Sequence, residues 1–92
     1  MTVQQENDEK DGRFFIEQEG KILAEMTYVW AGIDRIIISH TGVDEILKGR
    51  GAGNMMVNKA VEFAREKSIK IIPLCTFAKS VFDKTPEFKD VL

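Results

Sequence analysis

Three glycines alternate with other residues just ahead of a segment with helical spacing, at Gly49, Gly51 and Gly53. Because a glycine has no Cβ atom, the backbone can turn tightly there and approach a ligand closely. The N–H groups of the first helical turn have no partner within the helix and point into the same space. We therefore expect residues 49–54 to bind an anion, with a phosphate group as the foremost candidate. The alternative is a glycine-rich turn that binds nothing.

The spacing of this loop excludes two familiar phosphate sites. A P-loop ends in Gly-Lys-Ser or Gly-Lys-Thr, whereas Gly53 is followed by Asn54 and Met55. A dinucleotide-binding fingerprint would need a further glycine at Asn54 or at Met56. The loop therefore belongs to another class of phosphate-binding turn.

The elements that must position this loop can be predicted from hydrophobic spacing. Residues 1–12 are polar and carry few apolar side chains, which predicts a flexible leader. Alternation and β-branched runs predict three strands, and apolar residues at helical spacing predict a long helix from about Gly51 to Lys67. A short apolar run containing Pro73 predicts a strand parallel to the third, with interrupted pairing at the proline. The predicted strands cover 13–18, 21–30, 35–43 and 69–75. A second helix covers 77–84, with Phe77 and Val81 facing inward and Ala78 and Phe82 as further candidates for that face.

Composition limits the remaining possibilities. The 92 residues, 43% hydrophobic and 30% charged, suit one small domain with one sheet and two or three helices. A net charge of −2 gives no electrostatic reason to expect nucleic acid. No apolar run approaches the roughly 18 residues of a membrane span and no signal-peptide core is visible, so we expect a cytoplasmic protein. A single cysteine excludes an internal disulfide, and a single histidine argues against a zinc site without carboxylate ligands.

The hexapeptide Lys48–Gly53 resembles the acyl-CoA pyrophosphate loop of the GNAT-type N-acetyltransferase superfamily, usually written Gln/Arg-x-x-Gly-x-Gly/Ala. Both glycines fit this pattern, and Lys48 keeps a cation where Gln or Arg is usual. A small single-domain subgroup of N-acetyltransferase-like proteins is similar in four segments, at residues 39–43, 47–53, 72–75 and 86–88. The resemblance spans Arg13 to Leu92, and it implies a single acetyl-CoA-binding domain over residues 13–92.

The resemblance implies a GNAT-like α/β fold, in which an antiparallel meander is followed by a helix and a splayed parallel strand in a mixed central sheet. It also implies acetyl-CoA as the cofactor. The pantetheine arm would lie in a gap between residues 39–43 and 71–75, and the pyrophosphate would rest on the glycine loop. The implied cofactor contacts are Thr41, Val43, Lys48, Gly49, Arg50, Gly51, Ala52, Gly53 and Asn54. The cations that could bind the ribose phosphate of CoA are Lys79, Lys84 and Arg50.

Cys75 and His40 are the candidate catalytic residues, because each lies at the end of one of the two implied splayed strands. Many members of the family carry a tyrosine acid where Phe82 stands, and a phenyl ring cannot donate a proton. Cys75 precedes a predicted helix start, a position that favours a nucleophilic thiolate, so an acetyl-Cys75 intermediate with His40 as base is chemically feasible. The alternatives are a small core cysteine and a hydrogen-bonded structural histidine.

Three functions are compatible with the sequence. The first is an acetyl-CoA-dependent N-acetyltransferase that transfers an acetyl group to an unidentified amine. The second is a CoA-binding module with little or no turnover. The third, a structural adaptor without a ligand, leaves the three glycines unexplained. We expect acetyl-CoA and an amine acceptor as partners, no nucleic acid, no membrane, no metal, and a monomer or weak dimer.

Overall fold

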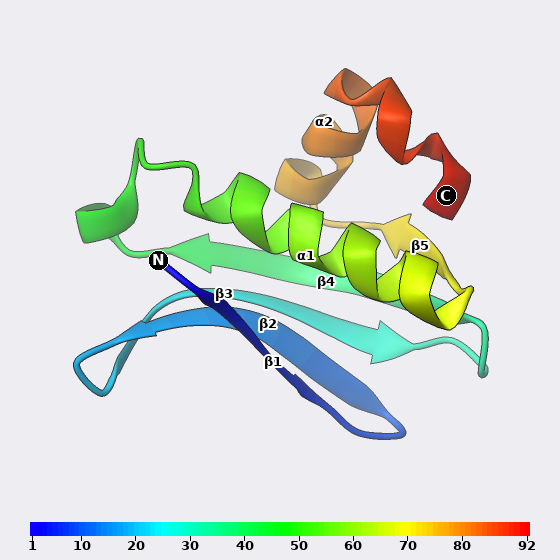
Figure 1. Cartoon of the computed structure of the whole chain (residues 1–92), viewed down its shortest axis with the longest axis horizontal. Helices are drawn as coiled ribbons and strands as arrows, with labels where there is room; N and C mark the ends of the chain where they lie inside the picture. Colours follow the sequence, from blue (N-terminus) through cyan, green and yellow to red (C-terminus); the bar gives the residue numbers. More distant parts are fainter.

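Alternating side chains and tight turns fold the first half of the chain into consecutive strands, as the computed structural model of all 92 residues shows (Figure 1). The strands are β1 (Val3–Asn7), β2 (Asp11–Gln18), β3 (Lys21–Trp30), β4 (Arg35–Val43) and β5 (Lys70–Pro73). The helices are α1 (Ala52–Lys67) and α2 (Thr76–Lys84), with short 3-10 helices at η1 (Glu45–Leu47) and η2 (Pro86–Val91). From β2 onward the elements follow the predicted order.

The five strands form one sheet in the order β1-β2-β3-β4-β5. The first four strands pair antiparallel, and β5 pairs parallel to β4. A parallel neighbour needs a crossover connection, because both strands start at the same end of the sheet, and α1 provides it. The predicted fold class, an antiparallel meander followed by a helix and a parallel strand in a mixed sheet, is confirmed.

Residues 3–7 form the edge strand β1, whereas the sequence predicted a flexible leader over residues 1–12. That prediction was wrong because backbone hydrogen bonds to β2 hold an edge strand without apolar side chains. The polar side chains of β1 also have partners. The Tyr28 hydroxyl donates to Asn7 Oδ1 at 2.6 Å and accepts from Gln5 Nε2 at 2.9 Å. They thereby satisfy the hydroxyl of a side chain that is only 1% exposed.

The core lies between the sheet and α1, and Figure 1 shows α1 running along the sheet with α2 on the same side. Four aromatic rings extend this core at one end, with neighbouring ring centroids 5.3 to 6.5 Å apart, from Phe14, Tyr28, Trp30 and Phe63. The helix contributes apolar side chains at helical spacing, which are Ala52, Met56, Val57, Ala60, Val61 and Ala64. Neither α-helix combines the length and the apolar character that crossing a bilayer requires.

The inward face of α2 agrees only in part with the prediction. Ala78 and Phe82 are buried, whereas Phe77 is 39% exposed and Val81 is only partly covered. Residues four apart share one face of a helix, and in α2 that face is set by Ala78 and Phe82. Phe77 therefore stands at the edge of the helix interface, next to the glycine loop described below.

Candidate active site

The glycine loop connects η1 to α1. Asp44 Oδ1 accepts a hydrogen bond from Ile46 N at 3.0 Å at the start of η1, and Leu47, 1% exposed, anchors that short helix in the core. The chain then turns through Gly49 and Gly51, whose φ angles are +78° and +75°. A Cβ atom at either position would meet no other atom within 4 Å. Left-handed backbone, and not crowding, is therefore what requires glycine at these two positions.

The first amides of α1 have no hydrogen-bond acceptor in the protein. The first helical bond runs from Met55 N to Gly51 O at 3.0 Å, and the N–H groups of Ala52, Gly53 and Asn54 donate to nothing. Free amides and the positive end of the helix dipole together attract an anion. The hollow that they border has a volume of about 270 Å³ and is lined by Val43, Leu47, Lys48, Gly49, Gly51, Ala52, Gly53, Asn54 and Phe77.

The predicted cofactor residues line this hollow, apart from Thr41 and Arg50. Lys48 is its only cation, so the departure from the Gln/Arg pattern still leaves a positive charge beside the free amides. Arg50 is exposed and lies outside the lining. The structure thus brings seven of the nine predicted contacts to one hollow beside the free amides, which we call the anion-binding hollow after its predicted role.

Gly53 has a different role from the two glycines before it. It lies inside α1 with ordinary helical backbone, and a Cβ atom there would lie 2.4 Å from Cζ of Phe77. The missing side chain therefore lets the Phe77 ring of α2 rest directly on α1. The sequence pointed to a phosphate-binding role for all three glycines, but for Gly53 the observed constraint is helix packing. Phe77 itself, which lines the hollow, was missed because its spacing suggested a core residue.

β4 and β5 separate where the sequence predicted interrupted pairing. Their last paired residues are Ile38 and Pro73, and the Ile38 carbonyl then accepts from both Leu74 N at 3.0 Å and Cys75 N at 3.2 Å. Beyond this point β4 continues to Val43, while the other chain turns into α2. The predicted gap between residues 39–43 and 71–75 is thus shorter than expected, because residues 71–73 are still paired. We call this separation the fork.

Cys75 lies at the base of the fork and is partly buried. Its Sγ atom is 3.2 Å from Thr41 Oγ1 and accepts a hydrogen bond from Ala78 N at 3.3 Å. The second contact makes Cys75 the N-cap of α2, as the predicted helix start at Thr76 implied. The sulfur atom therefore lies within hydrogen-bond distance of the Thr41 hydroxyl on β4 and of the Ala78 amide in the first turn of α2.

His40 lies on the other face of the sheet from Cys75. The register between β3 and β4 shifts at Ser39, so that His40 pairs with Thr27 and Thr41 pairs with the fully buried Met26. Directly opposed residues share a face, which places Thr41 on the helix side and His40 on the outer side. The shared face of His40 and Gly42 agrees with this, because a Cβ atom on Gly42 would lie 3.4 Å from His40 Nε2. The structure therefore does not bring the two candidate catalytic residues together.

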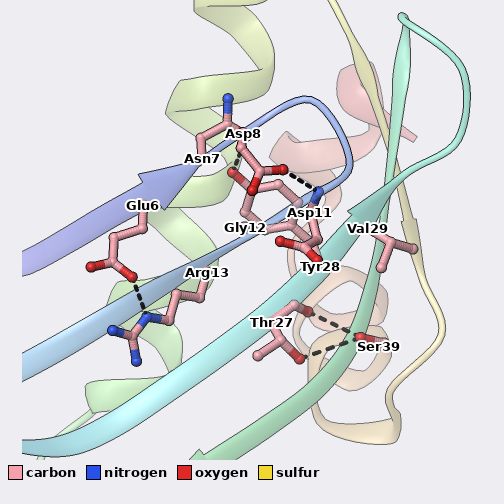
Figure 2. Close-up of a pocket in the computed structure, with 10 residues that line it drawn as sticks. All are labelled: Glu6, Asn7, Asp8, Asp11, Gly12, Arg13, Thr27, Tyr28, Val29 and Ser39. Atoms are coloured by element: carbon pink, nitrogen blue, oxygen red, sulfur yellow. Dashed lines mark hydrogen bonds and ion pairs between the residues drawn. The ribbon is translucent and has the colours of Figure 1, made fainter.

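A second hollow, of about 500 Å³, lies over β1 to β4 and contains none of the predicted site residues. Figure 2 shows the Arg13 guanidinium turned toward Glu6, at 2.7 Å, and Ser39 beside Thr27. Arg13 also pairs with Glu25 at 2.6 Å, and these hydrogen bonds, that to Glu6 first, raise the pKa of Arg13 above its usual value. Amide hydrogen bonds from Asp11 and Lys10 lower the pKa of Asp8. Glu6, Arg13 and Asp8 thus have partners in one another, in Glu25 or in the backbone.

Comparison with known proteins agrees with this geometry. A family model described as GCN5-related N-acetyl-transferase matches residues 13–91. The NMR solution structure of a GCN5-like candidate N-acetyltransferase from Staphylococcus aureus is 36% identical, covers 98% of this chain and 85% of that one, and superposes with a TM-score of 0.76. No curated protein sequence matched the chain.

Two larger proteins share the fold at low identity. The crystal structure of ribosomal-protein-alanine N-acetyltransferase from Brucella melitensis biovar Abortus 2308 is 13% identical, with 84% of this chain and 62% of that one covered and a TM-score of 0.68. The crystal structure of a predicted acetyltransferase with acetyl-CoA from Clostridium acetobutylicum is 18% identical, with 80% and 55% covered and a TM-score of 0.65. The chain spans less than two thirds of either protein.

Three observations indicate the same family. They are the loop with free amides, the fork, and the family-model match over residues 13–91. The 36% identity to the Staphylococcus aureus protein extends across the entire fold, β1 included. This chain therefore belongs to the GCN5-related N-acetyltransferase family, a family of acyltransferases.

Proposed function

We propose that this protein binds acetyl-CoA and transfers its acetyl group to an amine in the cytoplasm, by way of Cys75. The observation that carries the proposal is the position of the Cys75 thiol at the base of the fork, 3.2 Å from the Thr41 hydroxyl and 3.3 Å from the Ala78 amide. Both groups can donate a hydrogen bond to a sulfur anion, which favours the nucleophilic form of a thiol.

The anion-binding hollow and the fork are suited to opposite ends of one ligand. The free amides of residues 52–54 and Lys48 would hold the pyrophosphate of CoA. Val43 and Phe77 line that hollow, and each lies two residues along the chain from a residue at the thiol, Thr41 or Cys75. At roughly 3.4 Å per strand residue, Val43 is about 7 Å from Thr41 along β4. A pantetheine arm can bridge this distance and bring its thioester to Cys75.

The proposed chemistry has two balanced steps. In the first, Cys75 Sγ bonds to the thioester carbonyl carbon, the bond from that carbon to the CoA sulfur breaks, and the proton that Cys75 loses ends on the CoA sulfur. In the second, the amine nitrogen bonds to the acetyl carbon, the bond to Sγ breaks, and the proton lost by the amine restores the thiol. Thr41 and Ala78 would stabilise the sulfur anion that enters the first step and leaves the second.

A specific observation favours the second candidate, a CoA-binding module with little turnover. Phe82 is 3% exposed and packs against Phe88 with ring centroids 5.9 Å apart, and its phenyl ring has no proton to donate. No carboxylate or imidazole makes a hydrogen bond to the thiol either. The first step therefore relies on hydrogen-bond donors without a base in contact, which predicts slow acylation.

Intact-protein mass spectrometry after incubation with acetyl-CoA tests the proposal. We expect one acetyl group on the wild-type protein and none on Cys75→Ala, with CoA affinity by calorimetry retained in both. An unmodified wild type that still binds acetyl-CoA would refute the covalent route and leave the binding module. Absence of CoA binding in a folded wild-type protein would refute both candidates.

A further inference from the structure

We propose that two copies of this chain form a symmetric dimer, in which their β1 strands pair antiparallel and join the two sheets into one. The strand β1 is the free edge of the sheet at the end opposite to β5 (Figure 1). Residues 4–7 of this strand are exposed. A free edge presents backbone N–H and C=O groups that a strand of another chain can bind.

The hairpin between β1 and β2 determines which backbone groups of β1 point away from the sheet. Asp8 N donates to Asp11 O at 2.9 Å, so this pair is a bonded one. Bonded and non-bonded pairs alternate along an antiparallel ladder, and the register of β1 with β2 has no shift. Glu6 and Gln4 therefore bond to β2, and the residues between and beside them do not. The backbone groups that point outward are those of Val3, Gln5 and Asn7.

One register between two copies uses all of these outward groups. When Gln5 faces Gln5 of the second copy, Val3 faces Asn7 of the second copy, and each outward N–H meets an outward C=O. A shift of the register in either direction leaves some of these groups without a partner. The twofold axis of this pair is perpendicular to the sheet, so the α1 helices of both copies cover the same face of the joined sheet.

The side chains on the other face of β1 favour the same register. There Gln4 faces Glu6 of the second copy, and by symmetry this pair occurs at both ends of the interface. Gln4 is exposed and has no side-chain hydrogen bond, so its amide can donate to that carboxylate. Glu6 Oε1 accepts from Arg13 Nε at 2.7 Å, which leaves Oε2 for the new contact. A register shifted toward Asn7 would instead place the two Glu6 carboxylates opposite each other, which is destabilising.

The two edges of the sheet differ in a way that limits the assembly to two copies. The strand β5 has four residues and ends at Pro73, which has no N–H to donate to a neighbouring strand. The strand β1 carries neither proline nor lysine and pairs with β2 without a bulge, so it lacks the features that usually block an edge. An interface that uses the same strand of both copies is closed. Because it is short, it should dissociate on dilution.

Sedimentation equilibrium over a wide range of protein concentrations tests the dimer. We expect the apparent mass of the wild type to rise toward twice the monomer mass. Gln4→Glu places a carboxylate opposite Glu6 of the second copy and should raise the dissociation constant of the dimer about tenfold, because facing like charges destabilise a strand pair. Gln18→Glu makes the same change at an exposed position of β2 beyond the residues paired with β1. It is the matched control and should keep the wild-type constant.

A second variant tests the backbone of the same strand. Val3→Pro removes an outward N–H at the first residue of β1, where a proline is tolerated, and should raise the dissociation constant about tenfold. Val3→Ala keeps this N–H and should change the constant by less than about twofold. Backbone NMR spectra of each variant confirm that the fold is retained.

Three results would overturn the proposal. The first is a wild type that stays monomeric at the highest concentration that the protein tolerates. The second is a dimer whose dissociation constant is unchanged in Gln4→Glu or in a folded Val3→Pro, because such a dimer uses another surface. The third is an assembly of more than two copies, which a closed interface between β1 strands does not allow.

Discussion

At the scale of single residues, the contact that matters most joins Thr41 to Cys75. The sequence placed both near the cofactor but paired the thiol with His40. A one-residue register shift at Ser39 turns Thr41 toward the helices and His40 away from them. A hydroxyl can stabilise a thiolate by donating to it, yet it does not take up a proton as an imidazole does. On the proposed covalent route Thr41 would therefore position the thiol, whereas His40, on the outer face, would have no part in its acylation.

Thr41→Val should slow the acetylation of Cys75 by roughly tenfold, because a hydrogen bond to a charged group contributes about 1.5 kcal/mol. The side chain keeps its shape, so CoA affinity should change by less than about twofold, on the order of 0.4 kcal/mol. A time course of intact mass at saturating acetyl-CoA measures the rate, and calorimetry measures the affinity. His40→Ala is the control and should react at the wild-type rate. A slow His40→Ala together with a normal Thr41→Val would restore the histidine as base.

At the scale of elements, the packing of α2 on α1 depends on the absence of a side chain at Gly53, where a Cβ atom would lie 2.4 Å from the Phe77 ring. Replacing glycine by alanine inside a helix otherwise stabilises it by about 1 kcal/mol. We expect Gly53→Ala to raise the free energy of unfolding only in a Phe77→Ala background. With Phe77 present, the new methyl group displaces the ring, and the lost packing offsets the gain in helix stability. Urea unfolding of the four proteins of this double-mutant cycle gives the coupling. Equal gains in both backgrounds would show that the ring does not constrain residue 53.

The edge strand β1 makes a second prediction at this scale. Asn7 Oδ1 accepts from the Tyr28 hydroxyl at 2.6 Å and from Trp30 Nε1 at 3.0 Å. Asn7→Ala leaves both donors short of a partner and should lower the free energy of unfolding by about 1 to 3 kcal/mol. Gln4→Ala, at an exposed position on the same strand without a side-chain hydrogen bond, should change it little. Thermal or urea unfolding measures both. Equal, negligible effects would mean that residues 3–7 do not contribute to the folded domain.

At the scale of the whole molecule, an ion pair between Arg65 and Asp90 connects the C-terminal η2 to α1. Arg65 donates to both oxygens of Asp90 at 2.9 Å and to the Glu87 carbonyl at 2.8 Å. The hydrogen bonds from Arg65 hold the pKa of Asp90 below its usual 3.8. A carboxyl group whose pKa is depressed by folding stabilises the folded state above its unfolded pKa, and this contribution is lost as the pH falls through the folded value. Acid should therefore loosen this end of the chain.

Asp90→Asn should make stability less dependent on pH below about 4, the unfolded range of an aspartate, because an amide does not titrate there. The melting temperature of the variant, compared with that of the wild type at pH 7 and pH 3, measures the difference. We expect the drop between the two pH values to be smaller in Asp90→Asn. Glu66→Gln, at an exposed site of α1 without an ion pair, serves as control and should show the wild-type drop. If the melting temperature of Asp90→Asn fell as much as that of the wild type, the contact between Arg65 and Asp90 would not contribute to the loss of stability in acid.

The sequence by itself determined the features that depend on local spacing. Apolar periodicity predicted β2 to β5 and the bounds of α1 to within one residue, because a strand and a helix each impose their own repeat on neighbouring residues. Glycine spacing predicted the tight turn ahead of α1, since left-handed backbone at Gly49 and Gly51 is a local requirement. Anion binding by this turn stays a prediction. The sequence predicted interrupted pairing at Pro73 because a proline cannot donate to the sheet, and the pairing of β4 with β5 ends directly after that residue.

Only the tertiary structure decided two kinds of feature. The first are contacts between residues far apart in the sequence, and the second are changes of side-chain face caused by a single inserted residue. The strand β1 has no apolar signature, and its side-chain partner Tyr28 lies 21 residues from Asn7. The Cys75 sulfur meets Thr41 across 34 residues, and Gly53 meets Phe77 across two helices. A β-bulge at Ser39 leaves no mark in the alternation of polar residues, yet it moves each following side chain to the opposite face of the sheet. Faces and partners are set by packing, and packing is not a property of any local stretch of chain.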